Sequence, residues 1–274
     1  MAKSTKNTSS DEMSFLEHLE ELRWHLIRSV VAVLIMAVVC FVFKSFIFDT
    51  ILLAPKSPDF LTYRWLCDIV TFIGLDQSLC IDQLDFDIQS RKVSGQFSTH
   101  IWVSITAGFI IAFPYVLYQF WKFISPGLYN NERFFARGVI FVSSLLFFMG
   151  VLFGYYVVTP LSINFLGNYK VSNIVMNEFD LDSYIGIVRA AVLSSGLIFE
   201  LPVIIYFLTK IGLVTPQFLK SSRKYMVVII LILSAIITPP DVASQIAVAI
   251  PIMVLYELSI LISRRVIKNQ PKDR

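Results

Sequence analysis

Long apolar runs separated by short polar segments make up most of the chain. Four runs reach full length, at residues 26–48, 98–121, 138–160 and 184–208. Because about 20 apolar helical residues cross the hydrocarbon core of a bilayer, each run predicts one transmembrane helix. Two further runs cover residues 225–237 and, interrupted by polar residues, 242–263. The pattern predicts an all-α, polytopic membrane protein with six transmembrane helices, the last two short.

The fifth run is too short to cross a bilayer by itself, because residues 225–237 span only about 20 Å as a helix. The segment Thr238, Pro239, Pro240 and Asp241 follows it directly and favours a tight turn into the last run. We therefore expect a short hairpin, with local thinning of the bilayer as the response to its length.

The charges indicate how the chain is oriented. If both termini lie on one side, that side carries 15 Lys and Arg residues in its connecting segments, against 6 on the other. Loops rich in Lys and Arg stay in the cytoplasm, so both termini are predicted to be cytoplasmic. The first run lacks a signal-peptidase cleavage pattern and is interpreted as a retained anchor.

Composition agrees with a single membrane domain over residues 1–274. Hydrophobic residues make up 56% of the chain, the mean hydropathy is +0.70 and only 16% of residues are charged, where soluble domains have about 25%. We expect a cytoplasmic amphipathic segment (1–25), a six-helix membrane domain (26–263) and a basic cytoplasmic tail (264–274). A net charge of +3 does not indicate nucleic-acid binding.

The amphipathic segment begins with a capping-box spacing between Ser14 and Glu17. It is predicted to lie along the membrane surface before the first span. One face carries Glu17, Glu21 and His25 at four-residue steps. Spacing alone leaves open whether this polar stripe is a solvated face or a binding site.

Five sequence segments, in this order, resemble those of the TatC family, the multi-spanning subunit of the twin-arginine translocation system. They are HLEELR (18–23), PYVLYQFW (114–121), FISPGLYNNER (123–133), FELP (199–202) and TPPDV (238–242). The family often has basic residues after the ELR signature, whereas Trp24 and His25 follow it here.

The resemblance implies a receptor for twin-arginine signal peptides. A guanidinium is best met by a carboxylate that accepts two parallel hydrogen bonds. The resemblance assigns this role to Glu21 and Glu132, with Arg23 holding the first carboxylate. Phe123 and Tyr129 are expected to pack against the apolar part of the signal, with membrane anchoring by interfacial aromatics as the alternative. Considered without the resemblance, Glu132 could equally be a first-turn acid of the third span.

Glu200 is the most unusual residue, since it lies about 15 Å inside its span. An ionisable group there costs free energy unless it is neutral, paired or hydrated. The resemblance implies that it faces a groove where the single-span TatA and TatB subunits dock. Gln245 and Glu257 share a helical face and are predicted to belong to the same polar lining, with an interhelical hydrogen bond as the alternative.

The outer segment 49–97 is longer and more acidic than expected for the family. Cys67 and Cys80 lie within it, on the oxidising side, and are predicted to form a disulfide. Because the cysteines lack CxxC spacing and a nearby His cluster, we expect no metal and no cofactor. A GxxxG pair, Gly150 and Gly154, favours close helix packing in the third span.

Together these features predict a Sec-independent translocase subunit of the bacterial inner membrane, embedded in the lipid bilayer and self-associating in a receptor complex. It would bind folded precursors through their signals and recruit TatA and TatB. No nucleotide-binding or hydrolytic motif is present, so no enzyme is expected. A rival hypothesis, a small-solute transporter with Glu200 and Glu257 as proton carriers, predicts internal repeats, and we find none between the two halves.

Overall fold

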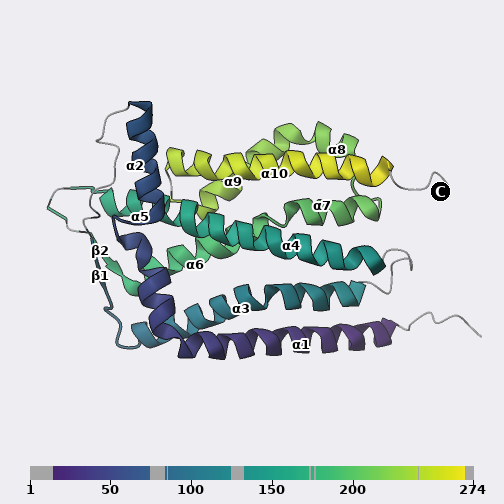
Figure 1. The fold of residues 1–274 in the computed structure, drawn as a ribbon, viewed down its shortest axis with the longest axis horizontal. Coiled ribbons are helices and arrows are strands. Elements are labelled where there is room, and N and C mark those ends of the chain that lie inside the picture. Colours follow the sequence, from purple (N-terminus) through teal and green to yellow (C-terminus); the bar gives the residue numbers. More distant parts are fainter. Residues whose placement is uncertain are drawn as a thin grey trace, which may run out of the picture.

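Long helices run side by side in a bundle, as the apolar runs predict (Figure 1). The computed structural model describes residues 15–74, 84, 86–124, 133–172, 174–175, 177–239 and 241–268. Within these ranges, five helical segments are long and apolar enough to cross a membrane: Leu19–Val42, Gly95–Phe123, Gly138–Asn168, Leu181–Lys210 and Ser244–Lys268. The fifth predicted run is absent from this set because of its length.

The first helix, α1 (Phe15–Val42), continues without a break from the N-terminal segment into the first span. The expected surface helix is therefore not a separate element. Its sequence contains no Gly or Pro at which a helix would bend, so the amphipathic turns simply extend the span. Helix α3 (Gly95–Ile124) packs along α1, and a Cβ on Gly108 would lie 2.5 Å from the backbone nitrogen of Ala37.

The third and fourth spans are each built from more than one helical segment. The third joins α4 (Arg133–Phe153), the π-helical η6 (Gly154–Val158) and α5 (Thr159–Asn168). The fourth joins α6 (Leu181–Ile198) and α7 (Leu201–Lys210). The close packing predicted from the GxxxG pair is confirmed: a Cβ on Gly150 or Gly154 would lie 2.5 Å from a backbone oxygen of α6.

The C-terminal hairpin follows the short α8 (Pro216–Ser221) and consists of α9 (Arg223–Ile237) and α10 (Val242–Lys268). The expectation of two short final helices holds for α9, which has 15 residues, but not for α10, which has 27. Gln245 and Glu257 do not interrupt α10, and each has a polar partner on α9.

The segment after α1 forms a cap over one end of the bundle, together with the segment after α5. Its elements are the π-helical η1 (Phe46–Leu52), the 3-10 turn η2 (Ala54–Lys56), α2 (Leu61–Ile73), β1 (Asp87–Gln89) and β2 (Glu178–Asp180). The two strands pair in parallel with Ile88 opposite Phe179. This small sheet was not predicted.

Tyrosine hydroxyls join the cap to the spans. Tyr63 donates to the carbonyls of Pro55 and Pro160, while Tyr155 and Tyr184 donate to the carbonyls of Ile51 and Leu52. Burial raises the pKa of the Tyr63 phenol, so it remains a donor. The cap is thus fixed to the spans by buried hydrogen bonds.

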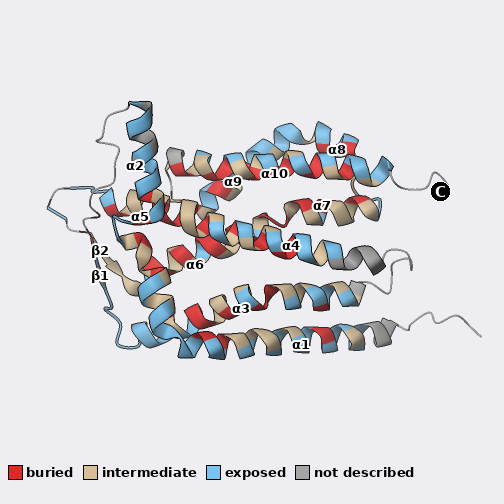
Figure 2. Cartoon of the chain, viewed as in Figure 1, coloured by how far each residue is buried: buried red, intermediate tan, exposed pale blue. Residues whose placement is uncertain are grey.

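The bundle has two distinct ends in Figure 1. We call the end where α1 begins and α10 ends the terminal end, and the opposite end, with α2 and the two strands, the cap end. Buried residues concentrate where α4, α6, α7 and α10 meet, whereas α1 is mostly exposed (Figure 2). Its exposed side chains include Leu26 and Val38. Such an apolar outer surface is suited to lipid.

Candidate functional site

The beginning of α1 and the end of α3 meet at the terminal end and bring Glu21, His25, Gln119 and Phe123 together (Figure 1). The Glu21 side chain is 36% exposed, and its Oε1 lies 3.9 Å from Nε2 of His25. His25 is buried, 6% exposed, with Nδ1 2.7 Å from Oε1 of Gln119. An accessible carboxylate is therefore held beside a buried polar pair.

Arg23 is exposed and forms no ion pair with Glu21. On the helix it lies two residues beyond Glu21, about 200° around the axis, so it points to another face. The neighbour of the Glu21 carboxylate is His25, one turn further on. The four-residue step from Glu21 to His25 was visible in the sequence, but the partner Gln119 was not singled out there.

The ring of Phe123 meets the edge of the His25 ring, with centroids 6.4 Å apart. It lies in the last turn of α3. The other predicted residues that follow it in the sequence, Tyr129 and Glu132, lie outside the described residues. The described part of the site thus consists of the α1 carboxylate and its supports on α3.

Glu200 occupies the break between α6 and α7, where the helix is interrupted ahead of Pro202. It is 8% exposed. The hydroxyl of Ser143, on α4, donates to its Oε2, while its Oε1 is buried with no hydrogen-bond partner among the described atoms. One half of the carboxyl is therefore satisfied and the other half is not.

Gln245 and Glu257 have partners of their own on α9. Gln245 Nε2 donates to the carbonyl of Leu231 at 2.9 Å, and Arg223 Nη2 donates to Glu257 Oε2 at 2.6 Å. These are contacts between neighbouring helices of the hairpin. In the described residues, neither side chain makes a hydrogen bond or an ion pair with Glu200.

The turn before α10 is held by Asp241. Its Oδ2 accepts from the backbone nitrogen and the hydroxyl of Ser244, at 2.8 and 2.7 Å, which caps the helix N-terminus. Pro239 precedes it, and Pro240 lies outside the described residues. The predicted turn residues thus include a helix cap that was not anticipated.

Cys67, in α2, is disulfide-bonded, whereas Cys40 is free and buried in α1. Cys80 lies outside the described residues, so the pairing of Cys67 with Cys80 stays a prediction. Across the described part of the chain, no group of three or more His, Cys, Asp or Glu side chains is placed to hold a metal ion.

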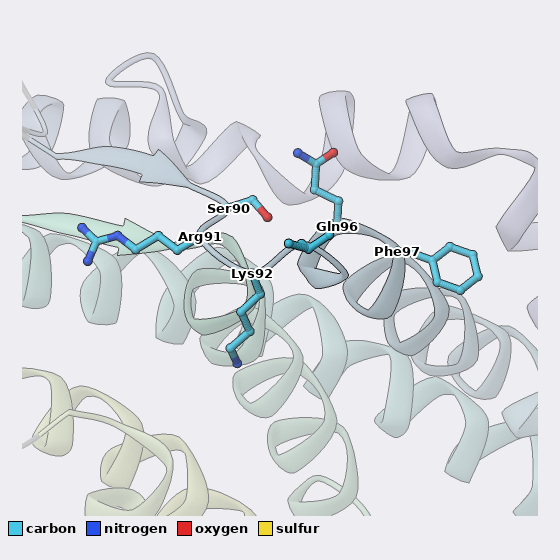
Figure 3. A pocket seen from close by; sticks show the side chains of 6 residues that line it. Ser90, Arg91, Lys92, Gln96 and Phe97 are labelled. Atoms are coloured by element: carbon cyan, nitrogen blue, oxygen red, sulfur yellow. The ribbon is translucent and has the colours of Figure 1, made fainter.

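The two best-defined cavities lie at the cap end, away from Glu21. The larger, of about 500 Å³, is lined by Ser90, Arg91, Lys92, Gln96 and neighbours, and the smaller, of about 380 Å³, adjoins it at Gln96. Figure 3 shows Arg91 and Lys92 pointing in different directions, and Arg91 is paired with Glu178. These side chains do not converge on a common ligand position.

The apolar helices, their lipid-suited outer faces and the polar groups held between them define a multi-pass membrane protein. The model of the family "Sec-independent protein translocase protein (TatC)" matches residues 17–251, and the chain belongs to this family. It is a family of protein translocase subunits and not of enzymes. Because its members translocate proteins, membership argues against the hypothesis of a small-solute transporter.

Relatives match over nearly their whole length. The TatC protein of Blattabacterium sp. subsp. Periplaneta americana (strain BPLAN) is 44% identical over 95% of this chain and 98% of its own. That of Aquifex aeolicus (strain VF5) is 35% identical, covering 92% and 95%. A crystal structure described as "Twin Arginine Translocase Receptor- TatC" superposes with a TM-score of 0.69 at 35% identity, covering 92% of this chain and 100% of that one.

Proposed function

We propose that this chain is the receptor subunit of a twin-arginine translocase in the bacterial inner membrane. It binds the signal peptides of folded precursors and recruits the single-span TatA and TatB subunits. The family supports a role in protein translocation, and the solved relative is described as a receptor. The observation that carries the proposal is the accessible Glu21 carboxylate beside the end of α3.

A twin-arginine signal offers two planar guanidinium groups, and a carboxylate is their natural acceptor. Glu21 meets one requirement directly, because its side chain is partly exposed while its surroundings are ordered by buried contacts. Glu132 is proposed as the acceptor for the second arginine. Phe123 and Tyr129 would contact the apolar part of the signal, and Arg23, being exposed, would act at the edge of the site.

The site must face the compartment in which precursors are made. Several helices that finish at the terminal end carry a Lys in their last turn: Lys122 in α3, Lys210 in α7 and Lys268 in α10 (Figure 1). The short α8 and the start of α9 add further basic residues there. By the positive-inside rule, we place this end in the cytoplasm, with α9 as a sixth, short crossing. Glu21 and the loop after α3 then lie on the face that meets a precursor first.

The docking of single-span partners is proposed at Glu200. Its buried Oε1 has no donor in the part of the chain that the structure describes, so a polar side chain from a partner helix could supply one. Gln245 and Glu257 would flank this surface through the α9–α10 hairpin. Several copies of the chain would associate in the complete receptor complex.

Binding of a labelled twin-arginine peptide to the purified chain tests the receptor function. Glu21→Lys should lower the affinity at least tenfold, since a hydrogen bond to a charged group contributes about 1.5–3 kcal/mol and the new charge repels the ligand. Glu132→Lys should act likewise while the protein still inserts. Glu20→Lys, an exposed neighbour on α1, is the matched control and should keep near-normal affinity. Equal binding of a twin-lysine peptide would refute the proposal.

A further inference from the structure

The buried histidine beside Glu21 makes contacts that the proposed role of Glu21 alone does not explain. His25 is enclosed between α1 and α3, with Nδ1 on Gln119 and Nε2 turned to Glu21. Gln119 in turn donates from Nε2 to the hydroxyl of Tyr115 at 2.6 Å. These two hydrogen bonds form a row whose His25 end lies 3.9 Å from the partly exposed Glu21 carboxylate.

The orientation of the Gln119 amide in this row indicates which nitrogen of His25 carries the proton. With its amide nitrogen engaged by Tyr115, Gln119 presents its oxygen to His25, and an amide oxygen only accepts. Nδ1 must therefore be the donor. In the neutral ring, Nε2 is then an acceptor. It lies 3.9 Å from Oε1 of Glu21, so two acceptors face the same space, with no donor between them among the described residues.

We propose that neutral His25 is a second acceptor for the signal peptide: its Nε2 and the Glu21 carboxylate together receive the N–H groups of one guanidinium. This rests on the proposed function and adds a specificity-determining residue to it. A guanidinium offers five N–H donors in a rigid plane, so it can serve two neighbouring acceptors at once. Gln119 is a positioning residue that fixes the tautomer.

Protonation of His25 removes the second acceptor. The imidazolium donates from Nε2 to Glu21, occupies the carboxylate and adds a positive charge where the arginine must enter. Of the described groups around the ring, Glu21 on α1 faces it directly and Tyr115 on α3 reaches it through Gln119. The charged residues one turn away on the two helices, Arg28 and Lys122, are exposed. Peptide affinity should therefore fall as the pH falls.

The test measures binding of the labelled twin-arginine peptide to the purified full chain between pH 8 and pH 5.5. Because only the neutral ring accepts, the affinity should drop about tenfold across this range. His25→Gln should weaken binding at pH 8 and give a flat profile. Gln119→Glu, which favours the charged ring, should move the drop to higher pH without removing a core side chain.

The other two histidines provide matched controls. His18→Gln, on the same helix, and His100→Gln, whose ring bonds the Phe41 carbonyl at the cap end, should keep the tenfold drop. If a twin-lysine peptide binds equally well at pH 8, the proposed function itself fails. If arginine is preferred but the profile is flat, or keeps its slope in His25→Gln, only the role of His25 is overturned.

Discussion

Single residues differ in how completely their polar groups are satisfied inside the bundle. Thr209 and Ser263 bond each other across α7 and α10, and Tyr256 donates to the carbonyl of Leu219. Glu200 is only half satisfied, by Ser143. A buried acceptor without a donor costs free energy, so its retention in the break of a span calls for a use other than stability.

Glu200→Leu should leave signal-peptide affinity unchanged and reduce co-purification of the single-span subunits several-fold, because the acceptor is lost. The thermal midpoint should not fall, since an ionisable group inside a span costs free energy itself. Glu200→Gln keeps a carbonyl acceptor of the same shape and should retain the partners. Normal co-purification in the leucine variant would contradict docking at this position.

At the scale of elements, apolar runs predicted where the spans lie but not how each is divided. The run around Glu200 gave no sign of the break between α6 and α7, because hydropathy averages over the local geometry set by Pro202. Likewise, the periodicity at Glu17 and Glu21 could not show that the N-terminal segment continues straight into α1. Elements follow from local sequence, whereas bends depend on packing partners far along the chain.

The glycine contacts between the third span and α6 give a prediction for one pair of spans. Gly154→Ala, in η6, should lower stability by about 1–3 kcal/mol, because the added Cβ would lie 2.5 Å from the Ala191 oxygen and 2.8 Å from Cα of Val192. Gly186→Ala, on α6 itself, meets nothing within 4 Å and should be neutral or slightly stabilising. The thermal midpoints of the two variants are measured in detergent. Equal midpoints would show that the close contact at Gly154 does not limit stability.

Across the whole molecule, the sequence was sufficient to predict the fold class and which helix ends lie at the same end of the bundle. It predicted only part of the site. Glu21 was found from a motif and a helical stripe. Its neighbour His25 is held by Gln119 on α3. Gln119 lies 94 residues beyond His25, so no local pattern relates the two. The two strands of the cap are short and separated by two spans, so their pairing had no signal in the periodicity either.

The unequal distribution of Lys and Arg is a property of the entire chain, and it predicts which end of the bundle faces the cytoplasm. Lys170, exposed near the cap end, and Lys122, exposed at the terminal end, are each replaced by cysteine in a background without Cys67 and Cys80. A membrane-impermeant maleimide should label position 170 in intact cells, and position 122 only after permeabilisation, because basic loops remain inside. Buried Cys40 should stay unlabelled in both cases. Labelling of position 122 in intact cells would put Glu21 on the face that precursors never meet, and the receptor role would fail with it.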